Sequence, residues 1–391
     1  MAKPPASALR ARLEGELASL EAQAQLRRLE VIPSLNFCSN DYLGLADDPR
    51  LREAVAAALA AGSAVGSTGS RLLSGNAAIW EDLEAQLAEF AGAEAVLYFN
   101  SGYAANVGLF SSVLRADDIV FSDSANHASI IDGIRLSGAR KVIFPHLDLN
   151  FLEAELRKSG SGGGQRFIAV ESVFSMDGDR APLADLLALA ERYGAETIVD
   201  EAHATGVFGP QGRGLVAADA GGRVFAVVHT CGKALAGMGA YVSGPAALKQ
   251  FLVNRARSFI FSTALPPYIA AQMRAVIGII SGADAERSRL ASLSAHLRAR
   301  LREAGFDTGR SDSQIIPVIL GQNDRAVEFA ARLCRDGFAV RAIRPPTVPP
   351  GAARLRLSLT VRHSAETLDR LVNALVEARE QINPSFCSAG Q

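Results

Sequence analysis

Apolar runs of two kinds alternate along the chain between Arg50 and Val340. Long runs with helical spacing, such as AIWEDLEAQLAEFAG at residues 78–92, predict helices. Short runs rich in Val, Ile and Phe predict buried strands at residues 95–99, 118–122, 141–145, 166–172, 197–200 and 224–230. Helices that alternate with such strands indicate an α/β domain with a mainly parallel central sheet.

The last part of the chain follows a different pattern. One long helical tract at residues 267–304 leads into strand-like runs with a helix between the first two and another at the end. The strand-like runs are residues 313–321, 338–343 and 353–360, and the first helix is residues 325–336. We expect a helical N-terminal arm at residues 1–48, a large α/β domain at residues 49–287 and a smaller α+β domain at residues 288–391.

Charge and cysteine content exclude several classes of protein. The chain has 391 residues and a formal net charge of -1, without a basic block that would attract nucleic acid. Its cysteines, which are Cys38, Cys231, Cys334 and Cys387, form no CxxC pair, so we expect neither a disulfide framework nor a metal site. The N-terminus is charged throughout and no long uncharged apolar stretch follows, which predicts a soluble, cytoplasmic protein that does not enter a membrane.

The run from Asp200 to His203 spells DEAH, the letters of a helicase ATPase box. Such a box needs an upstream GxxxxGK[ST] loop that cradles the nucleotide phosphates. The chain has no such loop. Its nearest candidate, CGKA, lies downstream and has Ala234 where the magnesium-binding hydroxyl should be. Asp200 is instead the last residue of an apolar strand, where open α/β sheets bind ligands.

Lys233 follows Asp200 by thirty-three residues, just beyond the next predicted strand and within a turn of small residues, CGKALAGMGAYVSG. Neighbouring strand ends therefore present a carboxylate and an amine. This pair suits pyridoxal 5'-phosphate (PLP), because the lysine can bind the aldehyde as a Schiff base while the aspartate keeps the pyridine nitrogen protonated. We expect PLP to be the cofactor.

Five further motifs stand in an order that resembles the α-oxoamine synthases, a family of fold-type-I PLP enzymes. They are LNFCSNDYLGL (35–45), GSTGSRLLSGN (66–76), FNSGYAANVGL (99–109), SANHASIIDGIRLSGA (124–139) and ESVFSMDGDRAPL (171–183). The resemblance covers nearly the whole chain. It implies a large PLP-binding domain with a smaller C-terminal domain, and a homodimer with shared active sites.

The resemblance also implies cofactor contacts. Gly102 stands at a predicted helix start, where free amides favour a phosphate, although a Ser-Gly helix start alone is usually only a cap. In the family, His127 stacks on the pyridine ring, His203 reaches the phenolic oxygen, and either Ser262 or Thr263 reaches the partner subunit's phosphate. The full expected cofactor set is Gly102, Tyr103, His127, Ser175, Asp200, His203, Thr230, Lys233 and Thr263, of which Lys233, Asp200 and His127 are expected to be catalytic.

Substrate contacts follow from the C-terminal segment AIRPPTVPPGAARLRLSLT. Arg354 and Arg356 lie on one predicted strand, and we expect only one of them to point into the cleft; the family match gives Arg356 the substrate carboxylate. Asn40 and Thr347 match further substrate contacts. For the acyl chain, Arg27 is the best match. The segment between the N-terminal helix and LNFCSN is often longer in the family than here, so Arg28 stays open. Either arginine could equally belong to a solvated helix surface.

RPPTVP resembles the biotin-pathway branch of the family, which condenses L-alanine with a pimeloyl thioester carried by coenzyme A or a carrier protein. The product is 8-amino-7-oxononanoate, with release of CO2 and the free thiol. A glycine-using sibling such as 2-amino-3-ketobutyrate CoA ligase stays open as an alternative. A catalytically inert PLP-binding scaffold also stays open.

Overall fold

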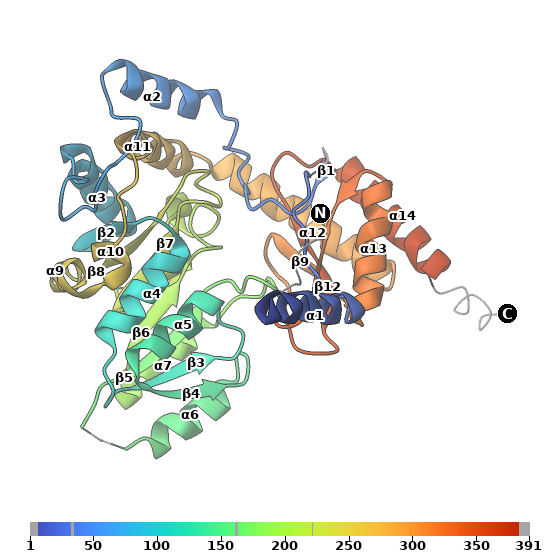
Figure 1. Ribbon diagram of the computed structural model, residues 1–391, viewed down its shortest axis with the longest axis horizontal. Coiled ribbons are helices and arrows are strands. Elements are labelled where there is room, and N and C mark those ends of the chain that lie inside the picture. Colours follow the sequence, from blue (N-terminus) through green and yellow to red (C-terminus); the bar gives the residue numbers. More distant parts are fainter. Residues whose placement is uncertain (1–6, 33–34, 161–162, 221, 383–391) are drawn as a thin grey trace.

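The computed structural model describes residues 7–32, 35–160, 163–220 and 222–382. Its largest feature is a seven-stranded sheet in the order β2-β8-β7-β6-β5-β3-β4 (Figure 1). The strands are β2 (Ala95–Phe99), β3 (Ile119–Asp123), β4 (Arg140–Phe144), β5 (Arg166–Glu171), β6 (Glu196–Asp200), β7 (Ala226–Thr230) and β8 (Ala240–Gly244).

Most neighbouring strands of this sheet are parallel, and only β8 runs antiparallel to both of its neighbours. The predicted mainly parallel sheet is therefore confirmed. The interpretation of the segment after Lys233 as a turn alone was wrong, because its second half, AYVSG, forms β8. Gly239 before it and Gly244 at its end hid it, because glycines are typical of turns.

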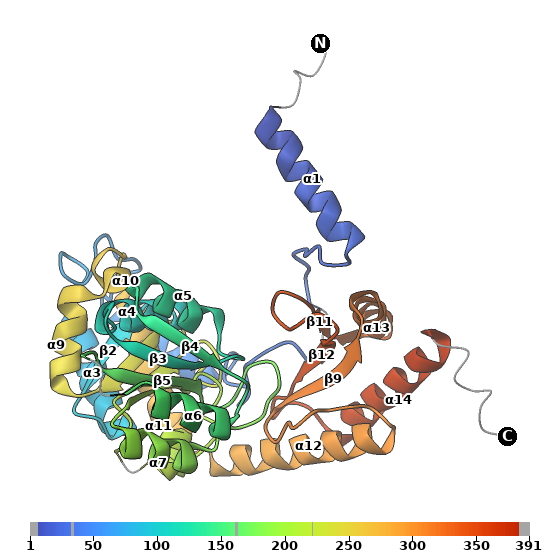
Figure 2. The same cartoon turned by 90° about the horizontal axis from the view of Figure 1, so that it is seen from below.

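Helices cover both faces of the large sheet (Figure 2). Along β2, Leu97 and Phe99 face one helical layer, while Val96 and Tyr98 face the other, as the two-residue period of a strand requires. The first layer contains α4 (Gly102–Val113), α5 (Ala128–Ser137), α9 (Ala246–Arg255) and α10 (Arg257–Ile260). The second contains α3 (Ala78–Ala91), α6 (Leu149–Lys158), α7 (Leu183–Tyr193), α8 (Leu215–Asp219) and α11 (Pro267–Ser281).

A second, antiparallel sheet lies in the C-terminal part, in the order β11-β12-β9. Its strands are β9 (Ile315–Gly321), β11 (Arg341–Ile343) and β12 (Ala353–Ser358). The helices of the C-terminal part are α12 (Asp284–Glu303), α13 (Asn323–Arg335) and α14 (Ala365–Ile382). The predicted strand at residues 338–343 is two strands, because β10 (Phe338–Ala339) pairs with β1 (Leu35–Asn36) whereas β11 pairs with β12.

The helical tract predicted at residues 267–304 consists of two helices. Gly282 and Ala283 separate α11, which packs on the large sheet, from α12, which extends toward the small one (Figure 2). Glycine stops helices readily because it is the most costly non-proline residue inside them. The domain boundary expected after residue 287 falls within the first turn of α12.

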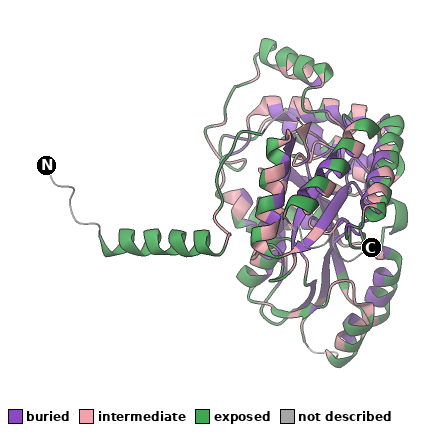
Figure 3. Ribbon diagram, turned by 90° about the vertical axis from the view of Figure 1, so that its right-hand side faces the viewer, coloured by how far each residue is buried: buried purple, intermediate pink, exposed green. Residues whose placement is uncertain are grey.

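The first part of the N-terminal arm, α1 (Ala8–Ala22), stands away from the rest of the described chain, whereas β1 pairs with β10. α1 has no buried residue and projects from the body of the molecule (Figure 3). A second helix, α2 (Pro49–Ala60), lies against α11, and a short 3-10 turn, η1 (Pro210–Gly212), follows the DEAH run. Among the described residues, no helix is long and apolar enough to cross a membrane.

Candidate active site

Asp200 and Lys233 line one cavity of about 420 Å³ at the carboxyl ends of neighbouring strands. β6 ends at Asp200 and is the parallel neighbour of β7, which ends at Thr230, three residues before Lys233. The other residues that line the cavity are Asn40, Asn100, Ser101, Gly102, Tyr103, Asn106, His127, Ser129, Glu171, Ala202, His203, Thr230, Gly232, Gly237, Met238 and Gly239. The fold thus brings together the carboxylate and the amine that the sequence singled out.

The Asp200 carboxylate is buried and held from two sides. Its Oδ1 accepts a hydrogen bond from the Ala202 amide at 2.8 Å, and its Oδ2 accepts one from Asn106 Nδ2 at 2.7 Å. Asn106 lies on α4 and also donates to Ser129 Oγ on α5. Two fixed donors orient the carboxylate and leave lone pairs for a further donor in the cavity.

Lys233 lies beside His203, with 3.0 Å between Nζ and Nε2. The other ring nitrogen of His203 lies 2.6 Å from the Tyr42 hydroxyl. Burial lowers the pKa of Lys233 to about 8, against the opposing effect of the Asp200 and Glu171 carboxylates. Burial, followed by the Lys233 charge, also lowers the pKa of His203 well below its usual value. The lysine can therefore lose its proton near neutral pH, and the histidine is neutral.

The N-terminus of α4 opens into the same cavity. Ser101 caps the helix by accepting from the Ala104 amide at 3.1 Å, while the amides of Gly102 and Tyr103 donate to no group in the described part of the chain. A Cβ at Gly102 would lie 2.5 Å from Thr230 Cγ2, so this position has room only for glycine. Free amides at a helix start favour an anion such as a phosphate.

His127 lines the cavity as the N-cap of α5, directly after the β3 loop. Burial, followed by the nearby Lys233, lowers its pKa, whereas Asp200 acts in the opposite direction. Its Nδ1 lies 2.8 Å from Ser129 Oγ, which fixes the ring orientation. Ala202 lines the same cavity, so a flat neutral ring and a methyl group both border the space.

Arg356 borders a smaller cavity of about 300 Å³ that shares Asn40, His127, His203 and Lys233 with the first. The guanidinium is 8% exposed and donates to the Ser175 carbonyl at 2.5 Å and to Asn40 Oδ1 at 3.2 Å. Arg354 instead pairs with Asp177. Of the two arginines, Arg356 alone lines a described cavity near Lys233.

Of the remaining predicted residues, some lie outside the Lys233 cavity, whereas Tyr103 and Thr230 line it. Arg27 donates to Thr347 Oγ1 at 3.3 Å, and Arg27 and Arg28 line an outer cavity of about 700 Å³ beside α13 that does not include Lys233. Thr263 does not line the Lys233 cavity, although its carbonyl accepts from Asn100 Nδ2, which does. Tyr103 lines the cavity, but its hydroxyl donates outward to Asp132. Thr230 Oγ1 donates to the Ala202 carbonyl at 3.2 Å.

Among the residues of the site that the sequence analysis missed are Tyr42, Asn106, Glu171 and Ala202. Glu171 is the last residue of β5 and pairs in register with Asp200. Burial, followed by the Asp200 charge, raises its pKa to about 8. Its place at a strand end was a usable signal. Tyr42 and Asn106 both lie within family motifs, LNFCSNDYLGL and FNSGYAANVGL, but no pattern in the sequence showed that their side chains point toward the site.

These groups fit the chemistry of PLP. A half-buried amine, a buried carboxylate and a helix start with free amides match the aldehyde, the pyridine nitrogen and the phosphate of that molecule. Within the described ranges, no group of three or more His, Cys, Asp and Glu side chains could hold a metal ion.

Comparison with known proteins agrees with this chemistry. The model of the aminotransferase class I and II family matches residues 32–375. The 8-amino-7-oxononanoate synthase of Geobacter sulfurreducens is 44% identical over 390 residues, which cover 95% of this chain and 98% of the relative. The 8-amino-7-oxononanoate synthase of Anaeromyxobacter dehalogenans is also 44% identical, over 95% of this chain and 96% of its own. The chain belongs to the 8-amino-7-oxononanoate synthase family.

Solved structures give the same fold for this synthase family member. A serine palmitoyltransferase from S. paucimobilis with bound PLP and myriocin has a TM-score of 0.88 at 28% identity, covering 97% of this chain and all (100%) of that one. The 8-amino-7-oxononanoate synthase of Francisella tularensis has a TM-score of 0.76 at 27% identity, covering 89% and 98%. The fold-type-I architecture, the PLP cofactor and the acyltransferase class predicted from the sequence are therefore confirmed.

Proposed function

We propose that this member of the 8-amino-7-oxononanoate synthase family condenses L-alanine with a pimeloyl thioester. The pimeloyl carbonyl carbon joins the alanine α-carbon, the carrier thiol leaves, and the alanine carboxylate leaves as CO2. The product is 8-amino-7-oxononanoate. The observation that carries the proposal is the buried Asp200 facing the same cavity as Lys233, with Arg356 at its side, in a chain 44% identical to relatives of that name.

When bound, PLP supplies the electron sink that makes the α-hydrogen of an amino acid acidic. Asp200, which Asn106 and Ala202 hold in place, would accept a hydrogen bond from the protonated pyridine nitrogen. His127 and Ala202 border the space for the ring. Each of these roles orients the cofactor rather than the substrate.

Lys233 moves the substrate proton in this proposal. A lysine with a pKa of about 8 is partly neutral at physiological pH, so it can accept the proton from the alanine α-carbon and later return one. His203 lies 3.0 Å from Nζ and is neutral, so it can orient the amine without repelling it as a cation would.

Arg356 binds the amino-acid carboxylate. Its buried guanidinium is held by Ser175, Asn40 and Ser358, so the fork is fixed before the substrate arrives. A preorganised planar fork pairs with a carboxylate through two parallel hydrogen bonds. Arg27 and Thr347, at the outer cavity, are proposed to meet the acyl donor.

A homodimer is part of the proposal. The α1 helix exposes Leu9, Leu13 and Leu17 by half or more, and Phe261 is 71% exposed beside Ser262 and Thr263. Apolar side chains exposed in this number favour burial against a partner. A second copy of this chain would cover them and place residues 262–263 near the partner's site.

The test is a panel of thioesters and amino acids. Pimeloyl, acetyl and succinyl groups are offered on coenzyme A and on a carrier protein, each with alanine or glycine, and product formation is followed by mass spectrometry. Pimeloyl with alanine should be fastest. A preference for glycine would point to the sibling ligase, and a PLP-loaded protein that turns over nothing would be a scaffold.

A further inference from the structure

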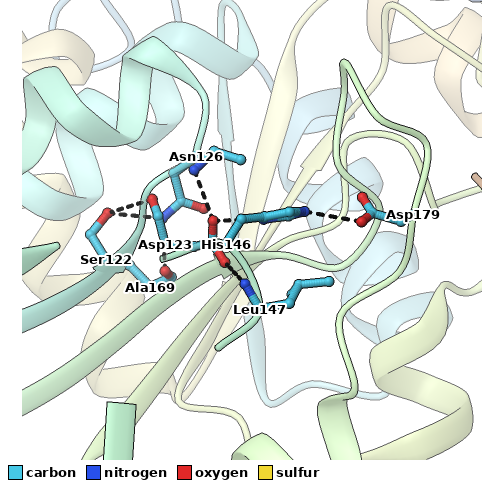
Figure 4. A network of polar contacts seen from close by, with 8 residues as sticks. Ser122, Asp123, Asn126, His146, Leu147, Ala169 and Asp179 are labelled. Carbon is cyan, nitrogen blue, oxygen red and sulfur yellow. Dashed lines mark hydrogen bonds and ion pairs between the residues drawn. The ribbon is translucent and has the colours of Figure 1, made fainter. Parts of the chain in front are cut away.

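His146 lies in the loop that joins β4 to α6, and each of its ring nitrogens meets a different carboxylate (Figure 4). Nδ1 lies 2.9 Å from Asp123 Oδ1, and Nε2 lies 3.0 Å from Asp179 Oδ2. An ionised carboxylate can only accept a hydrogen bond, so both ring nitrogens must donate. The ring is therefore an imidazolium.

The charge is stable at neutral pH. Burial alone would lower the pKa of His146, but the hydrogen bonds to Asp123 and Asp179 raise it to about 10. Asp123 and Asp179 are 1% and 5% exposed, and the other group against the ring is the edge-on Phe174, at 4.4 Å between centroids. These two carboxylates are the charged groups that face His146 in the described part of the chain.

One side of this contact supports the loop that carries His127. Asp123 ends β3 and also accepts from the amides of Ala125 at 2.8 Å and Leu147 at 2.9 Å. Asn126 then donates to Ser122 Oγ and to the Ala169 carbonyl (Figure 4). The next residue is His127, so its position at the cofactor cavity depends on this loop.

The other side supports the turn at residues 173–180, which a bridge between Val173 and Arg180 closes. Asp179 is held in it by its carbonyl, which accepts from the Phe174 amide at 3.0 Å. The same turn carries Ser175, whose carbonyl accepts from Arg356 at 2.5 Å. The two hydrogen bonds of His146 therefore join this turn to the His127 loop.

We propose that His146 is a positioning residue, which fixes the loop carrying His127 relative to the turn that holds Ser175 and Arg356. It touches neither cofactor nor substrate. By tying two loops from different parts of the chain, it sets the spacing between the ring site and the carboxylate site. Only the alanine KM measurement rests on the proposed function. PLP binding can be measured whichever substrates the enzyme uses.

The experiment compares holoenzyme variants. His146→Gln removes the charge and one donor, and Asp179→Asn weakens only the contact to the turn. His296→Asn is the matched control, because His296 makes a similar 3.0 Å contact to Asp369 on the surface. Each variant is measured for PLP dissociation constant, visible circular dichroism of bound PLP, alanine KM and kcat, and melting temperature, with all binding data taken well below melting.

His146→Gln should weaken PLP binding and raise the alanine KM, each by roughly tenfold, as expected for losing a hydrogen bond to a charged group. It should also change the PLP dichroism. Asp179→Asn should act in the same direction with a smaller effect, and the double variant should be no worse than His146→Gln. The control should match the parent protein in all four measurements.

A lowered melting temperature with unchanged PLP affinity, dichroism and alanine KM would overturn the proposal, since it would mark a purely structural role. If His146→Gln does not fold, Asp179→Asn decides by the same criteria. If the parent enzyme does not turn over alanine and pimeloyl thioester, the proposed function is contradicted. PLP affinity and dichroism would still decide the role of His146.

Discussion

Around Lys233 the polar groups are buried and hydrogen-bonded to one another, whereas Arg27 and Thr347 meet on an exposed edge through one contact of 3.3 Å. The first region comes from strand ends and helix starts of the large sheet. The second comes from the N-terminal segment and a loop before β12. Buried groups with several partners hold one geometry, while exposed arginines can change theirs at little cost.

This difference teaches where the chain itself specifies chemistry. The cofactor end is lined by buried, hydrogen-bonded groups and should respond strongly to single substitutions. The acyl end depends on exposed side chains, and in the proposed dimer also on the partner, so single substitutions there should have smaller effects.

The largest effect is expected from Lys233→Ala. Loss of a positioned base costs about a hundredfold to ten-thousandfold in rate, and the covalent anchor for PLP is lost as well. The turnover number with alanine and pimeloyl thioester measures this. Lys158→Ala is the control, since Lys158 is exposed on α6 and pairs only with Glu155. Equal activity of both variants would remove Lys233 from the mechanism.

Asp200→Asn should come next. An ion pair at about 4 Å with an effective dielectric near 20 contributes about 4 kcal/mol, which is roughly a thousandfold in rate. PLP should still bind, because the asparagine keeps the shape of the side chain. Activity and PLP content are measured side by side, and a variant with near-normal activity would show that the carboxylate charge does not matter.

Arg356→Ala should raise the alanine KM by roughly thirtyfold, because hydrogen bonds to a charged group contribute about 1.5 to 3 kcal/mol. By contrast, Arg27→Ala should raise the KM for the pimeloyl thioester by only about fivefold, since an exposed ion pair contributes less than about 1 kcal/mol. Arg28→Ala is the comparison that separates the two candidates. A larger effect for Arg28 would transfer the acyl contact to that residue.

The smallest expected effect is the pH dependence of PLP capture by the apoenzyme. The pKa of Lys233 lies at about 8, below its ordinary value of 10.5, because of burial. Capture of PLP by the apoenzyme needs the neutral amine, so its rate should rise with pH up to about 8 and then level off. Stopped-flow absorbance over a pH series measures this. A rate that still climbs above pH 9.5 would indicate an ordinary, solvated lysine.

The sequence allowed the cofactor end to be predicted to a large extent. Asp200 and Lys233 follow apolar strands, and parallel neighbours bring their ends to one edge, so their proximity follows from local pattern and topology. Gly102 stood at a predicted helix start after a strand, whereas the role of His127 came from the family resemblance.

The remaining contacts arise from packing between distant parts of the chain. Asn106 reaches Asp200 because α4 covers the sheet, and no periodicity in the sequence records which of its polar residues points inward. The N-terminal segment lacks even this constraint, since Arg27 and Arg28 are both exposed and a helix pattern cannot choose between them. β8 was missed because it continues the run of small residues around Lys233, and glycines at Gly239 and Gly244 favour a turn.

The central claim is that Lys233 holds the aldehyde of PLP opposite Asp200. The most direct measurement is borohydride reduction of the resting holoenzyme, followed by digestion and mass spectrometry of the peptides. The prediction is that the reduced cofactor mass lies on Lys233. Its presence on Lys3, Lys141, Lys158 or Lys249, which are the other lysines of the chain, or on none of them, would contradict it.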